Sequence, residues 1–112
     1  ASKNLLGVVG TPNQIHQNLA QRIADLISVI RPTLTVIDAY RILMDHGPTG
    51  GSLNDVKQTN TIIASHDIVA ADSYGATLFG LTGAEIPYLK KSSEMGLGTM
   101  DLSSVKVEEV NV

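Results

Sequence analysis

The residues best suited to chemistry in this sequence are three aspartates and a loop of one histidine and three glycines. The first aspartate, Asp38, lies near the end of the short β-branched run "LTVIDA" at 34–39. A carboxylate at the C-terminal end of a buried strand faces the crevice where open α/β sheets bind ligands. Asp38 could therefore ligate a metal ion, accept a hydrogen bond from a ligand or act as a base. The alternative is a structural role, in which its carboxylate caps the following turn by accepting from backbone N–H groups.

The other two aspartates flank the start of a run rich in small residues, "IVAADSYGATLFGL" at 68–81. Asp67 occupies the position of a helix N-cap, which by itself is a sufficient reason for an aspartate there. Asp72 lies where close packing of the helix is expected, and burial of an unpaired carboxylate costs on the order of several kcal/mol. We therefore expect Asp72 to face solvent, or to have a partner or a cation.

The loop at 46–51 reads "HGPTGG" and contains His46, Gly47, Gly50 and Gly51. Consecutive glycines permit positive φ angles and a close approach of the backbone to an anion, whose charge their N–H groups can bind. The pattern is neither a Walker loop nor a dinucleotide-binding glycine motif. A ligand-binding loop lined by His46 and a flexible corner are both compatible with these residues.

Metal and thiol chemistry are constrained by the residue types available. The chain has no cysteine, so it cannot supply thiolates for an iron–sulfur cluster, a disulfide or a nucleophile. Its histidines, His16, His46 and His66, lack the spacing of a zinc site. Carboxylate oxygens suit Mg²⁺, Mn²⁺ or Ca²⁺ better than zinc, so a divalent cation is the metal we consider. Its candidate ligands are Asp38, Asp67 and Asp72.

Composition limits the class of protein. The chain has 112 residues, of which 43% are hydrophobic and 17% charged, which is typical of one globular domain. The net charge is −3 and the cationic residues are scattered, so we expect no nucleic-acid partner. No apolar run approaches the roughly 18–20 residues of a membrane span, and no secretory signal is visible. The sequence therefore predicts a cytoplasmic protein that does not enter a membrane.

The elements that must position these residues alternate between strands and helices. Apolar residues at 15–30 follow helical spacing, and Arg31-Pro32 ends that helix. We expect strands at 4–9, 34–39 and 60–65, an edge strand at 103–110, helical turns at 40–45, a long loop at 47–60, and helices at 68–81 and 85–95. Such alternation predicts an α/β layered domain with a mostly parallel or mixed sheet and about three helices. The apolar opening "ASKNLLGVVG" further suggests that this single domain, 1–112, is a fragment of a longer protein.

Several blocks of the sequence together resemble a known bacterial and archaeal family, domain of unknown function 362, and specifically its C-terminal half. These blocks are "KNLLGVV" (3–9), "IADL" (23–26), "RPTLTVIDAYRIL" (31–43), "GPTGG" (47–51), "TIIASHDIVAADSYGATLFGL" (61–81) and "IPYLKKSSEMGLG" (86–98). The order and spacing of the blocks make the likeness fairly specific, and it covers nearly the whole chain. One departure is Ile68, where the family pattern has a proline.

The resemblance adds ligand-binding candidates at the polar positions of the family pattern. These are Lys3, Asn4, His16, Asp38, the loop glycines, Asp67 and Asp72. Many family members carry a ferredoxin-like cysteine-rich segment and are described as iron–sulfur cluster-binding proteins. The resemblance therefore implies a redox-linked protein whose cluster, if present, lies in a segment missing here, either a ferredoxin-like module or the remainder of the same protein.

Two functional hypotheses remain open. In the first, the domain binds a small-molecule or anionic ligand or a metal ion, with the three aspartates as oxygen ligands and the glycine loop around an anionic group. In the second, it is a non-catalytic scaffold that docks an electron-transfer module, and the carboxylates only cap helices and turns. The first requires Asp38, Asp72 and the loop to converge in one crevice, whereas the second predicts separate carboxylates with individual hydrogen bonds. Neither hypothesis identifies a reaction.

Overall fold

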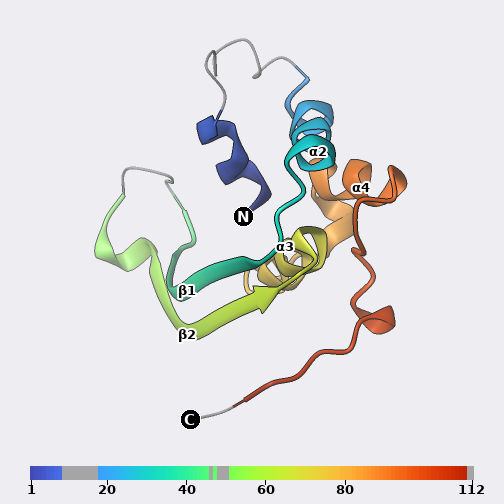
Figure 1. Ribbon diagram of the computed structural model, residues 1–112. Coiled ribbons are helices and arrows are strands. Elements are labelled where there is room, and N and C mark those ends of the chain that lie inside the picture. The colour runs from blue at the N-terminus through green and yellow to red at the C-terminus, as the bar shows by residue number, and fades with distance from the viewer. Residues whose placement is uncertain (9–17, 46, 48–50, 111–112) are drawn as a thin grey trace.

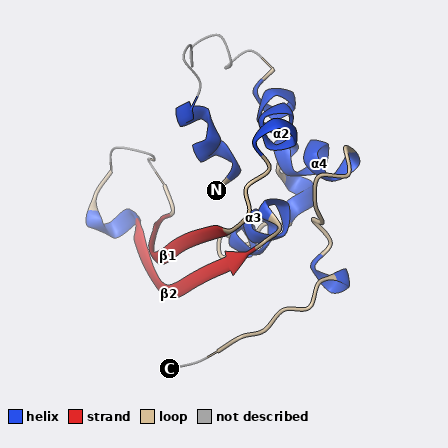
Figure 2. Ribbon diagram, in the orientation of Figure 1, coloured by secondary structure: helices blue, strands red, loops and turns tan. Residues whose placement is uncertain are grey.

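The computed structural model of the protein describes residues 1–8, 18–45, 47 and 51–110 (Figure 1). These residues form a mixture of helices and a sheet, as the sequence predicts, and three of the helices are α-helices (Figure 2). The main elements are the 3-10 helix η1 (Ser2–Val8), helix α2 (Leu19–Ile30), strand β1 (Thr35–Leu43), strand β2 (Val56–Ser65), helix α3 (Ile68–Thr77) and helix α4 (Pro87–Glu94). Short 3-10 turns complete the chain at Leu53–Asp55 (η2), Gly83–Glu85 (η3) and Leu102–Ser104 (η4).

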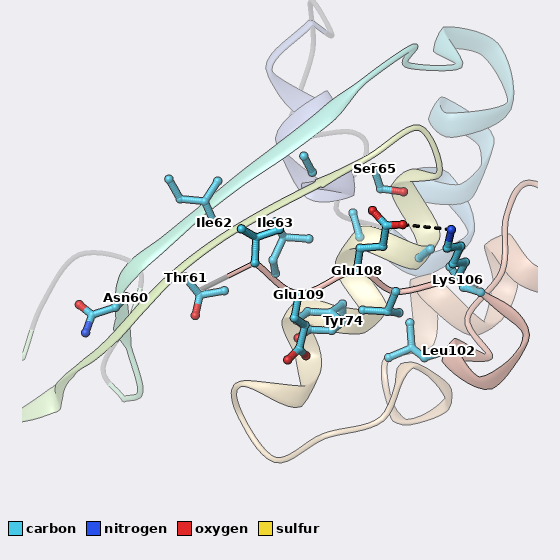
Figure 3. Close-up of a pocket in the computed structure, with 16 residues that line it drawn as sticks. Asn60, Thr61, Ile62, Ile63, Ser65, Tyr74, Leu102, Lys106, Glu108 and Glu109 are labelled. Atoms are coloured by element: carbon cyan, nitrogen blue, oxygen red, sulfur yellow. Dashed lines mark hydrogen bonds and ion pairs between the residues drawn. The ribbon is translucent and has the colours of Figure 1, made fainter. Parts of the chain in front are cut away.

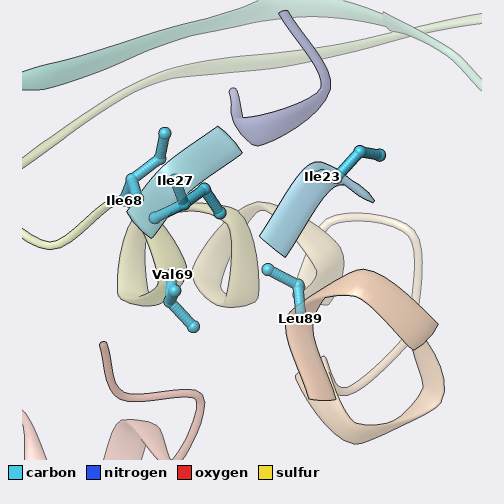
Figure 4. Packing of buried hydrophobic residues seen from close by; sticks show 5 residues of the cluster. All are labelled: Ile23, Ile27, Ile68, Val69 and Leu89. Carbon is cyan, nitrogen blue, oxygen red and sulfur yellow. The ribbon is translucent and has the colours of Figure 1, made fainter. Parts of the chain in front are cut away.

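The buried core lies where the three α-helices meet (Figure 4). Ile23 and Ile27 of α2 contact Ile68 and Val69 of α3 and Leu89 of α4, and all five side chains are at most 5% exposed. Burial of an aliphatic side chain of this size contributes about 1.5–3 kcal/mol, so this cluster is the main source of hydrophobic stabilisation. The opposite side of α3 packs against the sheet, which makes α3 the central element of the fold.

Helix α2 agrees with the amphipathic pattern in the described part of its range. It begins at Leu19, after Asn18 with φ of 53°, and residues 15–17 of the expected helix lie outside the described residues. It ends at Ile30 as predicted. Arg31 adopts φ of 46° and donates its backbone N–H to the carbonyl of Ile27, 3.0 Å away, just before Pro32 stops the helix.

The sheet in the described residues is a two-stranded antiparallel hairpin, not the mostly parallel or mixed sheet that the sequence predicted. The expected helical turns at 40–45 are wrong, because β1 continues to Leu43 and pairs it with Val56. The expected loop at 47–60 is correspondingly too long, since β2 already begins at Val56. The physical reason is tertiary pairing. Ile42 is buried against the rest of the fold in strand geometry, and this contact outweighs the weak local preference of a short segment.

The two ends of the chain also depart from the expected strands. The segment at 4–9 was expected to be extended, but residues 2–8 form η1, which places Leu5 and Leu6 against the helical core. The segment at 103–110 was expected to be an edge strand, but its residues 106–110 pair with no other strand in the described part of the chain. Hydrophobic pattern alone could not distinguish these outcomes, because both depend on which neighbour is available.

Two glycines end the helices on either side of η3. Gly80 and Gly96 both have φ of 73°, a left-handed conformation that glycine adopts at little cost. Helix α3 consequently ends at Thr77, earlier than the predicted residue 81, and α4 spans Pro87–Glu94 within the predicted 85–95. In neither helix, nor in any other that the structure describes, is there a stretch long and apolar enough to cross a membrane.

The approach of the chain at Gly98 to the start of α3 leads to a first prediction. A Cβ atom on Gly98 would lie 2.2 Å from Asp67 Oδ1 and 2.7 Å from Val69 Cβ. The substitution Gly98→Ala is therefore expected to lower the free energy of unfolding by about 1–3 kcal/mol, the usual cost of overpacking. Chemical denaturation measures the effect. Gly7→Ala is the matched control, because no atom lies within 4 Å of a Cβ placed on Gly7. Equal stability of the two variants would contradict the close contact.

Candidate functional site

A pocket of about 340 Å³ opens between β1, the second half of α3 and the start of α4. Its walls are mostly apolar, and the ionisable side chains among the residues that border it are those of Asp38, Asp72 and Tyr88. The apolar lining comes from Ala1, Ile37, Ala39, Ile42, Leu43, Gly75, Ala76, Leu78, Phe79 and Ile86. Pockets of roughly 300–1,000 Å³ with apolar walls and few polar groups are typical of small-molecule sites.

Small residues on α3 allow the strands to approach closely enough to form this pocket. A Cβ atom on Gly75 would already be in van der Waals contact, at 3.9 Å, with Cδ1 of both Ile37 and Ile63. Ile37 and Ala39 therefore face α3, since alternate residues of a strand point to the same side. The following residue of α3, Ala76, is also small and buried.

Asp38 borders the pocket, but strand alternation places its side chain on the opposite face of the hairpin. It pairs with Ile62, whose side chain is 72% exposed on the face away from α3. Asp38 Oδ1 accepts a hydrogen bond of 3.0 Å from the backbone N–H of Tyr40. Tyr40 has no partner in the strand register, because a bulge interrupts the ladder between Ala39 and Arg41. The carboxylate thus caps the bulge, as the structural alternative proposed.

Asp72 is buried inside the fold, with only 7% of its surface exposed. Its Oδ2 accepts a hydrogen bond of 2.7 Å from the backbone N–H of Ser2, and its Oδ1 accepts one from the nitrogen of Ala1. The expectation that Asp72 needs a partner is met in this way by the backbone of the first two residues. The two bonds fasten η1 to α3 beside the pocket.

Tyr88 is the functional candidate that the sequence did not reveal. Burial, together with the nearby negative charge of Asp72, raises the pKa of its phenol to about 12. Tyr88 is half-buried, and no hydrogen bond joins its hydroxyl to another described residue. The hydroxyl is not one of the fully buried atoms that lack a partner, so it is open to water or to a ligand in the pocket. A single tyrosine after a proline gives no sequence signal of this kind, because only the fold places it beside Asp72.

Asp67 lies away from this pocket and confirms its interpretation as an N-cap. Oδ1 accepts from the backbone N–H of Ala70 at 2.9 Å, and Oδ2 accepts from that of Thr99 at 2.9 Å. One carboxylate therefore begins α3 and also holds the segment after α4 against it. Both oxygens are used by the protein itself, which leaves this residue poorly placed as a ligand of a metal or small molecule.

The remaining predicted site residues are dispersed or lie outside the described residues. Lys3 and Asn4 are exposed on η1. Gly47 and Gly51 are exposed, and Gly51 has the positive φ, 78°, that the loop was expected to use. His16, His46 and Gly50 lie outside the described residues, so the cradle expected at 46–51 stays a prediction.

The described residues do not assemble the expected metal ligands into one site. Asp38, Asp67 and Asp72 each bind backbone nitrogen atoms at different places, and no group of three acidic or histidine side chains suited to a metal occurs among the residues described. An iron–sulfur cluster does not fit this chain either, because such clusters are held by cysteine thiolates and the sequence contains none. Asp38 and Asp72 do border one pocket, but only Asp72 has its side chain on the pocket side.

The capping role of Asp38 gives a second prediction. Asp38→Ala leaves the backbone N–H of Tyr40 without its acceptor and is expected to cost about 0.5–1.5 kcal/mol of stability. Asp38→Asn retains a carbonyl oxygen at the same place and is expected to cost much less. Urea denaturation of the two variants measures the difference. An equal loss in both would show that the negative charge matters rather than the hydrogen bond.

The shifted phenol of Tyr88 gives a third prediction. Its folded pKa of about 12 lies above the ordinary value of 10.0, so folding favours the neutral form. The stabilisation is complete below pH 10 and is lost as the pH rises toward 12, because the unfolded phenol ionises first. The tyrosinate absorbance is measured against pH for the unmodified protein and for Tyr88→Phe. The difference between the two curves isolates the titration of Tyr88. Asp72→Asn should lower the pKa, and a midpoint near pH 10 in the unmodified protein would refute the burial of this phenol.

Comparison with known proteins identifies the family. No curated protein sequence and no solved structure matches the chain. One family model does match, that of the domain of unknown function DUF362, over residues 1–77. The match includes β1, β2, α3 and Asp72, but not Tyr88. It spans more than half of the chain and agrees with the resemblance read from the sequence blocks, so this chain belongs to the DUF362 family.

Proposed function

We propose that this domain binds a small organic molecule in the pocket between β1, α3 and α4. The observation that carries the proposal is the hydroxyl of Tyr88, a donor without an acceptor among the described residues, in a pocket with apolar walls. An uncharged ligand with an apolar body and a carbonyl or ether oxygen would fill the pocket and accept this hydrogen bond. The energy of such a bond, about 1 kcal/mol net, sets the expected effect of removing it.

Charge favours a neutral acceptor over an anion in this pocket. Asp72 lies close enough to Tyr88 to raise the phenol pKa, so a ligand carboxylate at the hydroxyl would be repelled in the same way. The carboxylate of Asp72 itself accepts hydrogen bonds from the nitrogen atoms of Ala1 and Ser2. An anionic ligand, if one binds this chain, is better suited to the glycine loop at 46–51 than to this pocket.

A fourth prediction tests the proposal with defined probes. Ligand-observed NMR would screen neutral aryl amides and aryl ketones, with matched aryl carboxylates as the charged comparison. We expect the neutral acceptors to bind and the carboxylates to bind more weakly. Tyr88→Phe should weaken binding of the neutral probes about five-fold, corresponding to about 1 kcal/mol.

The matched control is Tyr40→Phe, because Tyr40 is half exposed on the hairpin and does not line the pocket. This variant should bind the same probes as the unmodified protein. No binding by any probe, or equal loss of binding in the two variants, would refute the proposed site.

A parallel thermal-shift series with Mg²⁺, Mn²⁺, Ca²⁺ and a chelator tests the divalent cation at Asp38, Asp67 and Asp72. Since the carboxylates lie apart, we expect that series to be flat.

A second candidate function is a docking scaffold linked to an electron-transfer module. Two observations favour it. Asp38, Asp67 and Asp72 each have hydrogen bonds to the protein backbone, which is the arrangement that this hypothesis predicted. In addition, the hairpin face away from α3 exposes Val36 and Ile62, at 60% and 72%. The proposed partner is a ferredoxin-like module, which the family resemblance implies. Chemical-shift mapping with a ferredoxin-type protein would locate its contact, and shifts outside the hairpin would count against this surface.

A further inference from the structure

A second groove, of about 330 Å³, lies between β2, α3 and the C-terminal segment (Figure 3). One wall consists of the consecutive residues 60–65 of β2, and the other contains all of residues 105–110. The C-terminal segment runs back beside β2 in the opposite direction, as Figure 1 shows. It is separate from the pocket of Tyr88 and shares no residue with it.

The edge of β2 that borders this groove has no strand partner in the described residues, because the sheet contains β1 and β2 alone there. Every second residue of such an edge presents an N–H and a C=O that a further strand could bind. A two-stranded hairpin is also marginal by itself, and a third strand normally increases its stability. The backbone N–H and C=O groups on this edge therefore form hydrogen bonds either with water or with another strand.

The C-terminal segment already has the alternation of a strand that would extend this sheet. Lys106 and Glu108 form an ion pair of 3.0 Å and are 86% and 72% exposed, so they share the outer side. Val105 is partly buried, and the exposed side chain of Glu109 accepts a hydrogen bond of 2.6 Å from the hydroxyl of Tyr74 on α3, so these two side chains lie on the side of α3. Residues two apart thus lie on one side, which is the periodicity of a strand.

The inner and outer sides of the segment match those of β2. On β2, Ile63 is buried against α3 while Ile62 and Ala64 are exposed on the outer face. A segment at 105–110 that paired with β2 would place Val105 and Val107 in the inner layer, and Lys106 and Glu108 in the outer layer. The segment would not need to rotate about its own axis, so pairing requires only that it move toward the free edge of β2.

We propose that residues 105–110 are a strap that closes on the free edge of β2 as a third, antiparallel strand and seals the groove. The structure holds the open arrangement, in which the Tyr74–Glu109 hydrogen bond keeps the strap beside its edge. Closure replaces water on the exposed backbone groups of β2 with inter-strand hydrogen bonds. The strap then controls access to the groove and protects the strand edge from pairing with other chains.

The test is residue-resolved amide hydrogen exchange on the full chain. Closure predicts slowed exchange for the β2 amides within 60–65 that point away from β1, and backbone contacts between Hα protons of 60–65 and 105–110 in NOE spectra. Exchange of those amides as fast as in an unstructured peptide, without such contacts, would overturn the proposal. The amides of α3 serve as an internal control that the fold is intact.

Two proline variants of the strap provide the matched comparison. Proline removes one backbone N–H and is tolerated on an edge strand only where that N–H faces solvent. In a closed strap, Val107 and Glu108 point their N–H groups in opposite directions. One of the variants Val107→Pro and Glu108→Pro should therefore raise the exchange rate of the protected β2 amides about ten-fold or more, and the other variant should have little effect on that rate. Equal behaviour of the two variants would overturn pairing. Tyr74→Phe removes only the hydrogen bond to Glu109, so it should raise the exchange rate of the same amides by a smaller factor.

Discussion

The fold depends on the constraint that α3 is packed on two sides at once. Its Ile68 and Val69 belong to the core with α2 and α4, while Gly75 and Ala76 face the hairpin. Small side chains on the hairpin side allow close approach, and the larger ones on the core side provide the hydrophobic burial. Because α3 has little exposed surface in its first half, the polar groups it carries must be satisfied within the protein. Asp72 and its bonds to η1 follow from that requirement.

The three aspartates show how chemistry and structure compete for the same residue types. Each was a candidate ligand, and each instead accepts hydrogen bonds from backbone nitrogen atoms: Tyr40 for Asp38, Ala70 and Thr99 for Asp67, Ala1 and Ser2 for Asp72. A polar group that lines the first pocket and has no protein hydrogen-bond partner among the described residues is the hydroxyl of Tyr88. A site is therefore better sought where a hydrogen-bonding group is left over than where charged residues are numerous.

Local signals predicted the helices well and the sheet poorly. The N-cap at Asp67 and the stop at Arg31-Pro32 are short-range features, and the structure has both. The hairpin was missed because "YRILMD" has no strong preference of its own, and its strand conformation comes from pairing with β2. The site followed the same rule. The small neighbours of Asp72 indicated that it must face solvent or have a partner or a cation, whereas the bulge capped by Asp38 and the placement of Tyr88 exist only after the strands and helices have packed.

The chain order of the packed helices has a consequence for how this protein reaches its fold. Helices α2 and α4 contact each other in the core, yet the whole hairpin and α3 lie between them in sequence. The hairpin joins neighbouring strands and can form by short-range loop closure, whereas the core must close a much longer loop. We therefore expect strand pairing to precede consolidation of the helical core, so that an early intermediate would expose the apolar surfaces of α2 and α3. Folding of this chain would then be more sensitive to crowding by other unfolded chains than its small size suggests.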